Sequence, residues 1–228
     1  ANDPVRATEK AKDLVRMAVA KAAYIEPLHQ VSLDVNRAGL VVGGGVAGME
    51  AALGVARQGY PAYLVERGNQ LGGVARQLGD TWRGEAVAPY LRDLIDQVVH
   101  HERITVFMES EVTHMTGTIG SFITTVTSNN GEKKTHTIEH GAGILATGGK
   151  EYRPTEYLYG KHPAVLTHLD LDAAMEEDAD LLKNAQSVAF IQCVGSRTPE
   201  RPYCSRVCCT HSLKNALALK MKNPATRV

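Results

Sequence analysis

One short glycine-rich segment constrains the fold of this chain more than any other feature. Gly43, Gly45 and Gly48 have the spacing Gly-x-Gly-x-x-Gly, and the apolar run 39–42 comes directly before them. The alanine-rich stretch 46–58 follows and has the composition of a helix. A glycine triplet between a buried strand and a helix is the fingerprint of a Rossmann unit, in which it lies against the pyrophosphate of a dinucleotide.

The second half of such a unit is also present. The apolar run 63–65 predicts another buried strand, and Glu66 follows it, 18 residues after Gly48. A carboxylate at that place can accept hydrogen bonds from ribose hydroxyls, and it disfavours a 2′-phosphate. Gly43 would permit the tight turn, and Gly45 would let the pyrophosphate approach the backbone. These features predict a bound dinucleotide, and by themselves they do not decide between NAD and FAD.

The remaining pattern predicts an α/β fold with a parallel sheet and a small antiparallel meander. Four β-branched runs and a turn signal at 129–131 predict the meander, with strands over 104–107, 111–116, 122–127 and 134–138. Further buried strands are expected over 143–146 and 187–191. Helices are expected over 4–24, from Pro89 to about 100, over 169–177 and over 205–221.

We therefore expect three parts in the chain. Residues 1–36 would form an amphipathic helix and a linker, residues 37–183 a Rossmann-like dinucleotide-binding domain that includes the meander, and residues 184–228 the start of a second nucleotide-binding-like unit. Only the first strand and helix of this second unit, over 187–221, are present, with Gly195 in place of a full glycine triplet. The second unit is therefore expected to be truncated.

Composition excludes several classes of protein. The chain has 25 Lys and Arg against 25 Asp and Glu, so no basic field for nucleic acid is present. Although 43% of its residues are hydrophobic, no apolar run approaches the roughly 20 residues of a membrane helix, and we expect a soluble protein without a membrane span. Four clustered cysteines without an apolar signal segment favour a reducing, cytoplasmic location.

The cysteines are the second candidate site. Cys193, Cys204, Cys208 and Cys209 have the pattern C-x10-C-x3-C-C, and we expect Cys193 at a strand end and Cys204 one helical turn before Cys208. Four soft thiolates suit a [4Fe–4S] cluster. Structural zinc, a redox disulfide and inert buried cysteines remain open, although neither paired zinc-knuckle spacing nor C-x-x-C is present.

Several motifs together resemble one family across almost the whole chain. They are the helix at 8–21, the segments 40–49 and 63–66, Leu-Gly-Gly at 71–73, Ala-Thr-Gly at 146–148, and the cysteine region 191–209. The chain is identified from them as similar to the flavin-bearing A subunit of heterodisulfide reductase. The resemblance implies a thioredoxin-reductase-like fold, FAD in the domain 37–183, and a [4Fe–4S] cluster on the four cysteines.

The same resemblance implies how the protein works and which residues hold the flavin. Electrons would pass between FAD and iron–sulfur clusters, and the partners would be other subunits of such a complex and iron–sulfur electron carriers. The expected FAD-binding residues are Gly43, Gly45, Val46, Ala47, Gly48, Glu66, Arg67, Gly72, Gly73, Val112, Ala146, Thr147 and Gly148.

Two departures from the family qualify the resemblance. The ferredoxin-type inserts with cysteine triplets that its members often contain are absent. The chain also begins without Met and ends at Val228, where the family's second half would only have begun, so we expect a fragment. Two other functions stay open, a stand-alone pyridine-nucleotide–disulfide oxidoreductase and a non-catalytic scaffold that binds a dinucleotide.

Overall fold

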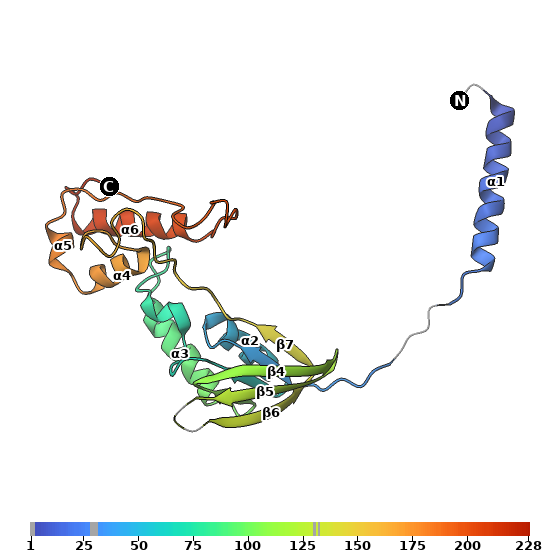
Figure 1. Cartoon of the computed structure of the whole chain (residues 1–228), viewed down its shortest axis with the longest axis horizontal. Helices are drawn as coiled ribbons and strands as arrows, with labels where there is room; N and C mark the ends of the chain where they lie inside the picture. The colour runs from blue at the N-terminus through green and yellow to red at the C-terminus, as the bar shows by residue number, and fades with distance from the viewer. Residues whose placement is uncertain (1–2, 28–31, 130, 132) are drawn as a thin grey trace. The chain divides into compact units, whose positions relative to one another are not determined.

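The computed structural model describes every residue except 1–2, 28–31, 130 and 132, and it divides into two units, Ala1–Asp34 and Val35–Val228. The first unit contains helix α1, Pro4–Ala23, close to the predicted range (Figure 1). Asp3 caps this helix by accepting hydrogen bonds from the first-turn amides, and none of the helix residues is buried. Part of the predicted linker, 28–31, lies outside the described residues.

A parallel sheet organises the second unit. Its strand order is β3-β2-β1-β7, and all three pairings are parallel. The strands are β1 Gly39–Val42, β2 Ala62–Val65, β3 Ile104–Phe107 and β7 Ala142–Leu145. The assignment of 104–107 to the meander was wrong, because helix α3, Val87–Val99, returns the chain alongside β2 as a parallel crossover.

A separate antiparallel sheet has the order β4-β5-β6 and confirms the rest of the predicted meander. Its strands are β4 Ser110–Thr118, β5 Ser121–Ser128 and β6 Lys134–His140. The register between β4 and β5 shifts between Val112 and His114, as at a bulge. The turn predicted at 129–131 includes residue 130, which lies outside the described residues.

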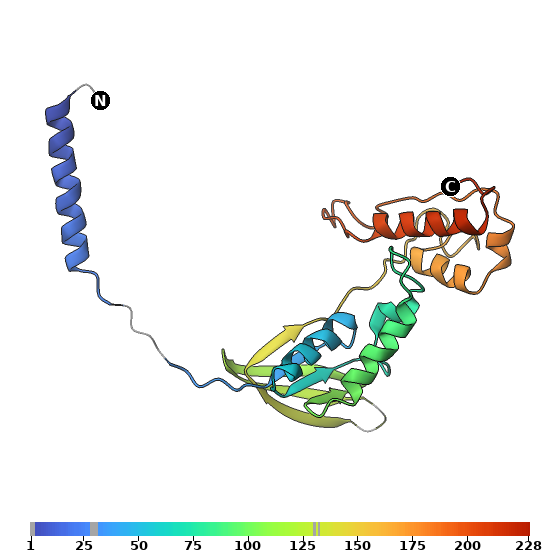
Figure 2. The same ribbon diagram turned by 180° about the vertical axis from the view of Figure 1, so that it is seen from behind.

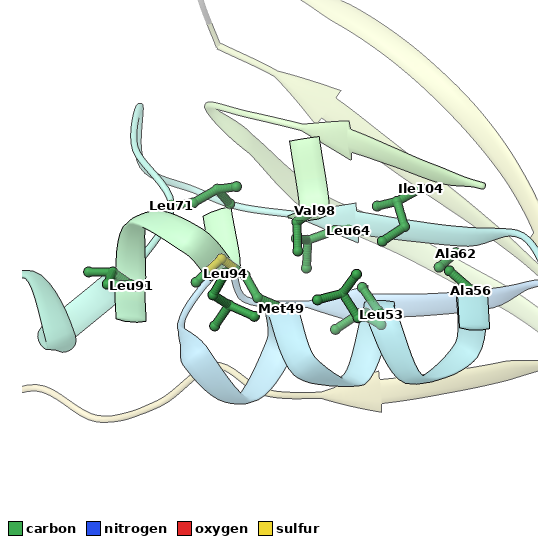
Figure 3. Packing of buried hydrophobic residues seen from close by; sticks show 12 residues of the cluster. Met49, Leu53, Ala56, Ala62, Leu64, Leu71, Leu91, Leu94, Val98 and Ile104 are labelled. Atoms are coloured by element: carbon green, nitrogen blue, oxygen red, sulfur yellow. The ribbon is translucent and has the colours of Figure 1, made fainter. Parts of the chain in front are cut away.

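The parallel sheet is covered on both faces. Helix α2, Val46–Arg57, and helix α3 pack on one face through a cluster that includes Val41, Met49 and Leu94 (Figure 3). The antiparallel sheet lies against the other face (Figure 2). Leu40 and Val65 of the parallel sheet pack there against Val126 and Ile138 of β5 and β6. Neighbouring residues of β1 therefore face opposite layers, as a strand buried on both sides requires.

Helices α4, His168–Glu176, and α6, Cys208–Lys222, lie within three residues of their predicted ranges. The 3-10 helix η1, Gly73–Gln77, and the short helix α5, Asp180–Lys183, were not predicted. Helix α3 begins two residues before Pro89, which its first turn tolerates because the N–H groups there have no helical partner. No helix among the described residues is long and apolar enough to cross a membrane.

Two predictions for the C-terminal part were wrong. The run 187–191 forms no sheet strand, and within this described run only Ser187 makes a bridge, to Arg227. A strand forms only where a neighbouring strand accepts its hydrogen bonds, and the described part of the chain offers this run no such neighbour. Helix α6 begins at Cys208 and not at 205, because Arg206 has a left-handed φ of 64°, which a helix cannot contain.

Candidate functional site

The glycine loop after β1 is closed by backbone packing at two of its three glycines. Gly43 has a φ of 111°, and a Cβ on it would lie 2.3 Å from the carbonyl oxygen of Ala146. A Cβ on Gly48 would lie 1.8 Å from the carbonyl oxygen of Gly43. These two glycines are therefore required by the turn and by the close packing of α2 on the loop.

Gly45 differs from its two neighbours in the motif. Its φ is −74°, which any residue can adopt, and a Cβ on it would have no atom within 4 Å. The fold itself therefore does not need a glycine at this position. The free space beside the loop is what an approaching pyrophosphate would require.

The second glycine pair lies directly on this loop. The Gly72 N–H donates to the Gly44 carbonyl at 2.8 Å, and Gly45 and Gly72 form a parallel bridge. A Cβ on Gly73 would lie 3.3 Å from the Gly45 Cα. The structure therefore brings together two motifs that are more than twenty residues apart in the sequence.

Helix α2 directs its first turn at the same space. Gly45 is its N-cap residue, and within the described part of the chain no side chain caps the helix. The amides at Val46 and Ala47 belong to the first turn, where N–H groups lack helical partners and carry the positive end of the helix dipole. An anionic group beside Gly45 would therefore meet backbone donors.

Glu66 directly follows β2, and its carboxylate binds backbone amides of two loops of the site. One carboxylate oxygen accepts the Gly44 N–H and the other accepts the Gly68 N–H, both at 2.6 Å. Each oxygen keeps a second lone pair for a further donor such as a ribose hydroxyl. The arrangement thus fits the ribose role expected of Glu66, and it adds a structural role that the sequence did not reveal. The next residue, Arg67, is exposed.

The end of β7 forms the other side of the site. The Ala146 N–H donates to the Val42 carbonyl at 2.8 Å, and Thr147 Cα lies 3.1 Å from the position of a Cβ on Gly43. Gly148 has a φ of 65°, and a Cβ on it would have no atom within 4 Å. Thr147 and Gly148 are both exposed and can face a ligand.

Val112 is placed differently from the other expected FAD-binding residues. It lies on β4, and its partly buried side chain packs against the cluster of Leu40, Val65, Val126 and Ile138 between the two sheets. Its side chain therefore belongs to the core, and only its backbone is left for a ligand.

Cys193 and Cys204 lie on one folded-back loop, and Cys208 and Cys209 are the first two residues of the helix that follows it, α6. The Arg197 N–H donates to the Tyr203 carbonyl at 3.2 Å, and the hydroxyls of Ser196 and Ser205 are 2.6 Å apart. This pairing returns the chain after Cys193 towards the start of α6.

All four thiols are free, so none is spent in a disulfide. Cys193 and Cys208 are half-buried, and Cys204 and Cys209 are exposed. The expectation that Cys204 lies one helical turn before Cys208 was wrong, because α6 begins only at Cys208. The described residues contain no group of three or more His, Cys, Asp or Glu side chains placed to hold a metal. Four thiols are suitable donors for an iron–sulfur cluster. In this arrangement, however, the four sulfurs do not form a ligand set.

Next to the cysteines lies a polar network that the sequence pattern did not predict. Buried Asp172 of α4 accepts hydrogen bonds from His211 at 2.6 Å and Lys214 at 3.1 Å. Burial raises the pKa of Asp172, but the hydrogen bonds and charges of these two partners outweigh it and hold the pKa below its ordinary value. The His168 ring stacks on His211, and burial together with that neighbour lowers the pKa of His168.

Only one signal in the sequence could have revealed this network. His211, Ser212 and Asn215 interrupt the apolar pattern of α6, and two of them, Ser212 and Asn215, are buried. Polar residues at a buried helix face need partners, so their presence indicates polar groups on a facing element. The identity of that element, α4, could not be read from spacing because it lies about forty residues away.

Comparison with known proteins gives the chain a family. The model of the family described as pyridine nucleotide-disulphide oxidoreductase matches residues 38–191. Over its full length the chain is 32% identical to the A subunit of the H(2):CoB-CoM heterodisulfide,ferredoxin reductase of Methanothermobacter marburgensis, and it covers 48% of that protein. It is 30% identical, again over its full length, to one of the iron-sulfur A subunits of the CoB--CoM heterodisulfide reductase of Methanopyrus kandleri, with 48% of that protein covered.

Solved structures give a weaker match. Thioredoxin reductase of T. acidophilum is 20% identical, with a TM-score of 0.42, over 55% of this chain and 41% of that one. This score is too low to establish more than a distant likeness.

The resemblance to the A subunit of heterodisulfide reductase is thus confirmed by its curated relatives, and the chain spans about half their length. The alignment with the M. marburgensis protein extends over 315 positions against 228 residues here, so that relative contains residues within the matched span that this chain lacks. The match to residues 38–191 covers more than half of the chain, and the chain belongs to the pyridine nucleotide-disulphide oxidoreductase family.

Proposed function

We propose that this chain is the FAD-binding part of a flavin subunit of the heterodisulfide reductase A type. The observation that supports this most is the open space at Gly45 within a glycine loop that is otherwise closed by packing. A glycine kept where the fold does not need one, beside uncapped helix amides, fits a ligand that touches the backbone. Family membership and the names of the relatives favour FAD as that ligand.

Six of the expected residues have a stated task in this proposal. The amides of Val46 and Ala47 face the pyrophosphate, Gly45 allows its approach, and Glu66 accepts hydrogen bonds from the adenosine ribose. Gly73 and Gly148 border the space in which the rest of FAD extends. FAD supplies two-electron redox chemistry when it is bound, while these residues position it and exclude a 2′-phosphate.

The cysteines are proposed to hold a [4Fe–4S] cluster near the flavin. Four free thiols on one folded-back loop and the first turn of the helix after it support this, as does the term iron-sulfur in the name of one relative. The exposed thiols of Cys204 and Cys209 must then move towards Cys193 and Cys208 when iron is bound. The cluster would receive single electrons from the flavin and pass them to other subunits or iron–sulfur carriers, in the cytoplasm.

Flavin retention in a matched pair of variants tests the first part of the proposal. Gly45→Val places a branched side chain in the open space, and Gly54→Val does the same on helix α2 where a Cβ also meets no atom within 4 Å. Both variants should keep the far-UV spectrum of the parent chain. Only Gly45→Val should lose the flavin absorbance of the purified protein. A full flavin complement in Gly45→Val would show that the loop does not face the pyrophosphate.

Metal analysis under anaerobic conditions tests the second part. We expect about four irons and matching sulfide per chain, and loss of both in Cys208→Ser. Stoichiometric zinc would indicate a structural metal site. A Cys204–Cys208 disulfide in iron-free anaerobic protein would indicate a redox pair, and either result would overturn the cluster.

A further inference from the structure

The Ser212 hydroxyl connects the two chain segments that carry Cys193 and Cys208. It donates a hydrogen bond to the Cys208 carbonyl at 2.9 Å, one turn earlier on α6. The side-chain amide of Gln192, the residue directly before Cys193, donates to the Ser212 Oγ. The buried Ser212 hydroxyl therefore links the first turn of α6 to Gln192, the residue next to Cys193.

The hydroxyl has no hydrogen-bonding capacity left over. A serine Oγ donates one proton and accepts two, and His168 Nε2 lies 2.6 Å from it as the third partner. With the proton of a neutral His168 on Nε2, the ring and the Gln192 amide fill both lone pairs, and the serine proton remains for Cys208. Replacing Ser212 by alanine would leave three polar groups in a buried site without their shared partner.

The surrounding loop needs such a connection. Cys193, Arg197 and Arg206 all have left-handed φ values, between 58° and 64°, and no regular strand or helix contains them. Backbone in that region is strained for these residue types, so it persists only where neighbouring contacts hold it. The pairing between Ser196 and Ser205 closes the far end of the loop, and Ser212 closes the end that carries Cys193 and Cys208.

We propose that Ser212 is a positioning residue, whose hydroxyl holds the Cys193 segment against the first turn of α6 so that these two thiols are adjacent before any metal is bound. The inference rests on the proposed function, in which both cysteines are cluster ligands. Thr210, an exposed residue on the same helix turn, offers a matched control because its side chain is outside this network.

The test measures thiol proximity in the iron-free chain. In a Cys204→Ser/Cys209→Ser background only Cys193 and Cys208 remain, and dibromobimane fluoresces when both its arms have alkylated thiols. Ser212→Ala should lower the initial rate of this cross-linking about tenfold, the factor that about 1.4 kcal/mol represents. Ser212→Thr should keep most of the rate, since it keeps the hydroxyl, and Thr210→Ala should leave the rate unchanged.

A second variant separates positioning from a general loss of stability. Gln192→Leu should lower the rate as Ser212→Ala does, and the double variant should be no slower than either, because both remove the same connection. A lower melting temperature with an unchanged cross-linking rate in Ser212→Ala would reduce the residue to a structural role and overturn the proposal.

Iron loading of the four-cysteine chain distinguishes this proposal from the proposed function. If the parent chain binds no iron, the proposal of a cluster is overturned. The cross-linking rates then still decide the role of Ser212. If the parent binds iron, Ser212→Ala should load less than Ser212→Thr and should change the EPR signal of the reduced cluster. Equal loading and an identical signal in the two variants would contradict the positioning role.

Discussion

Gly48 and Gly54 both lie in helix α2, yet only Gly48 is needed for close packing. A Cβ on Gly48 would overlap the Gly43 carbonyl oxygen, whereas a Cβ on Gly54 would meet nothing within 4 Å. We expect Gly48→Ala to destabilise the chain by about 1–3 kcal/mol or more through overpacking. Gly54→Ala should stabilise it by roughly 0.5–1 kcal/mol, because alanine loses less backbone entropy in a helix. Urea unfolding gives the free energy of unfolding of each variant. If both substitutions changed this free energy in the same direction, the packing described for Gly48 would be contradicted.

Asp172 makes the stability of the chain depend on pH. Its pKa is lower in the folded state than in the unfolded chain, so its contribution is complete above about pH 4 and is lost as the pH falls through the folded-state value. Asp172→Asn should cost about 3–5 kcal/mol at pH 7, because Lys214 loses its buried counter-charge.

The difference in unfolding free energy between the parent chain and Asp172→Asn should therefore shrink as the pH is lowered from about 5 to about 2. Denaturant titrations at several pH values give this difference directly, because other titrating groups are common to both proteins. A difference that stays constant over that range would show that Asp172 is not ionised in the folded chain.

At the scale of elements, helix α4 depends on its first turn. The Thr167 hydroxyl accepts the Asp170 N–H, and the Asp170 carboxylate accepts the Thr167 N–H, which together form a capping box. Thr167→Ala should lower the free energy of unfolding by about 1 kcal/mol, and Thr167→Ser should not, because serine keeps the acceptor. Hydrogen exchange of the α4 amides should report the loss locally. Uniform protection in both variants would mean that tertiary contacts alone hold the helix.

At the scale of the whole molecule, helix α1 should be dispensable for the stability of Val35–Val228. Both sheets and both buried apolar clusters consist of residues of this unit alone. A chain that begins at residue 35 should unfold at the same temperature as the full chain and keep its near-UV spectrum. A clear fall in melting temperature would contradict this expectation.

The sequence by itself determined the local elements around the glycine loop. Strand, glycine triplet, helix and second strand appeared within a residue or two of their predicted ranges, because apolar period and glycine placement are local properties. The grouping of the glycine motifs around one ligand was expected from the family resemblance alone, and the contact between Gly72 and Gly44 became known only from the structure. The family could likewise be identified from the motifs, while the residue contacts to FAD and iron stay predictions.

Only the tertiary structure decided which strands pair and which polar groups meet. Ile104–Phe107 has the β-branched pattern of a meander strand. Its place in the parallel sheet depends on the crossover through α3. Residues 187–191 are as apolar as a strand, yet they form none without a neighbour. Asp172, His211 and Ser212 converge because α4 packs on α6, a contact that no local spacing encodes. Periodicity specifies which face of an element is apolar, whereas partners far apart in the chain are selected only when those faces pack together.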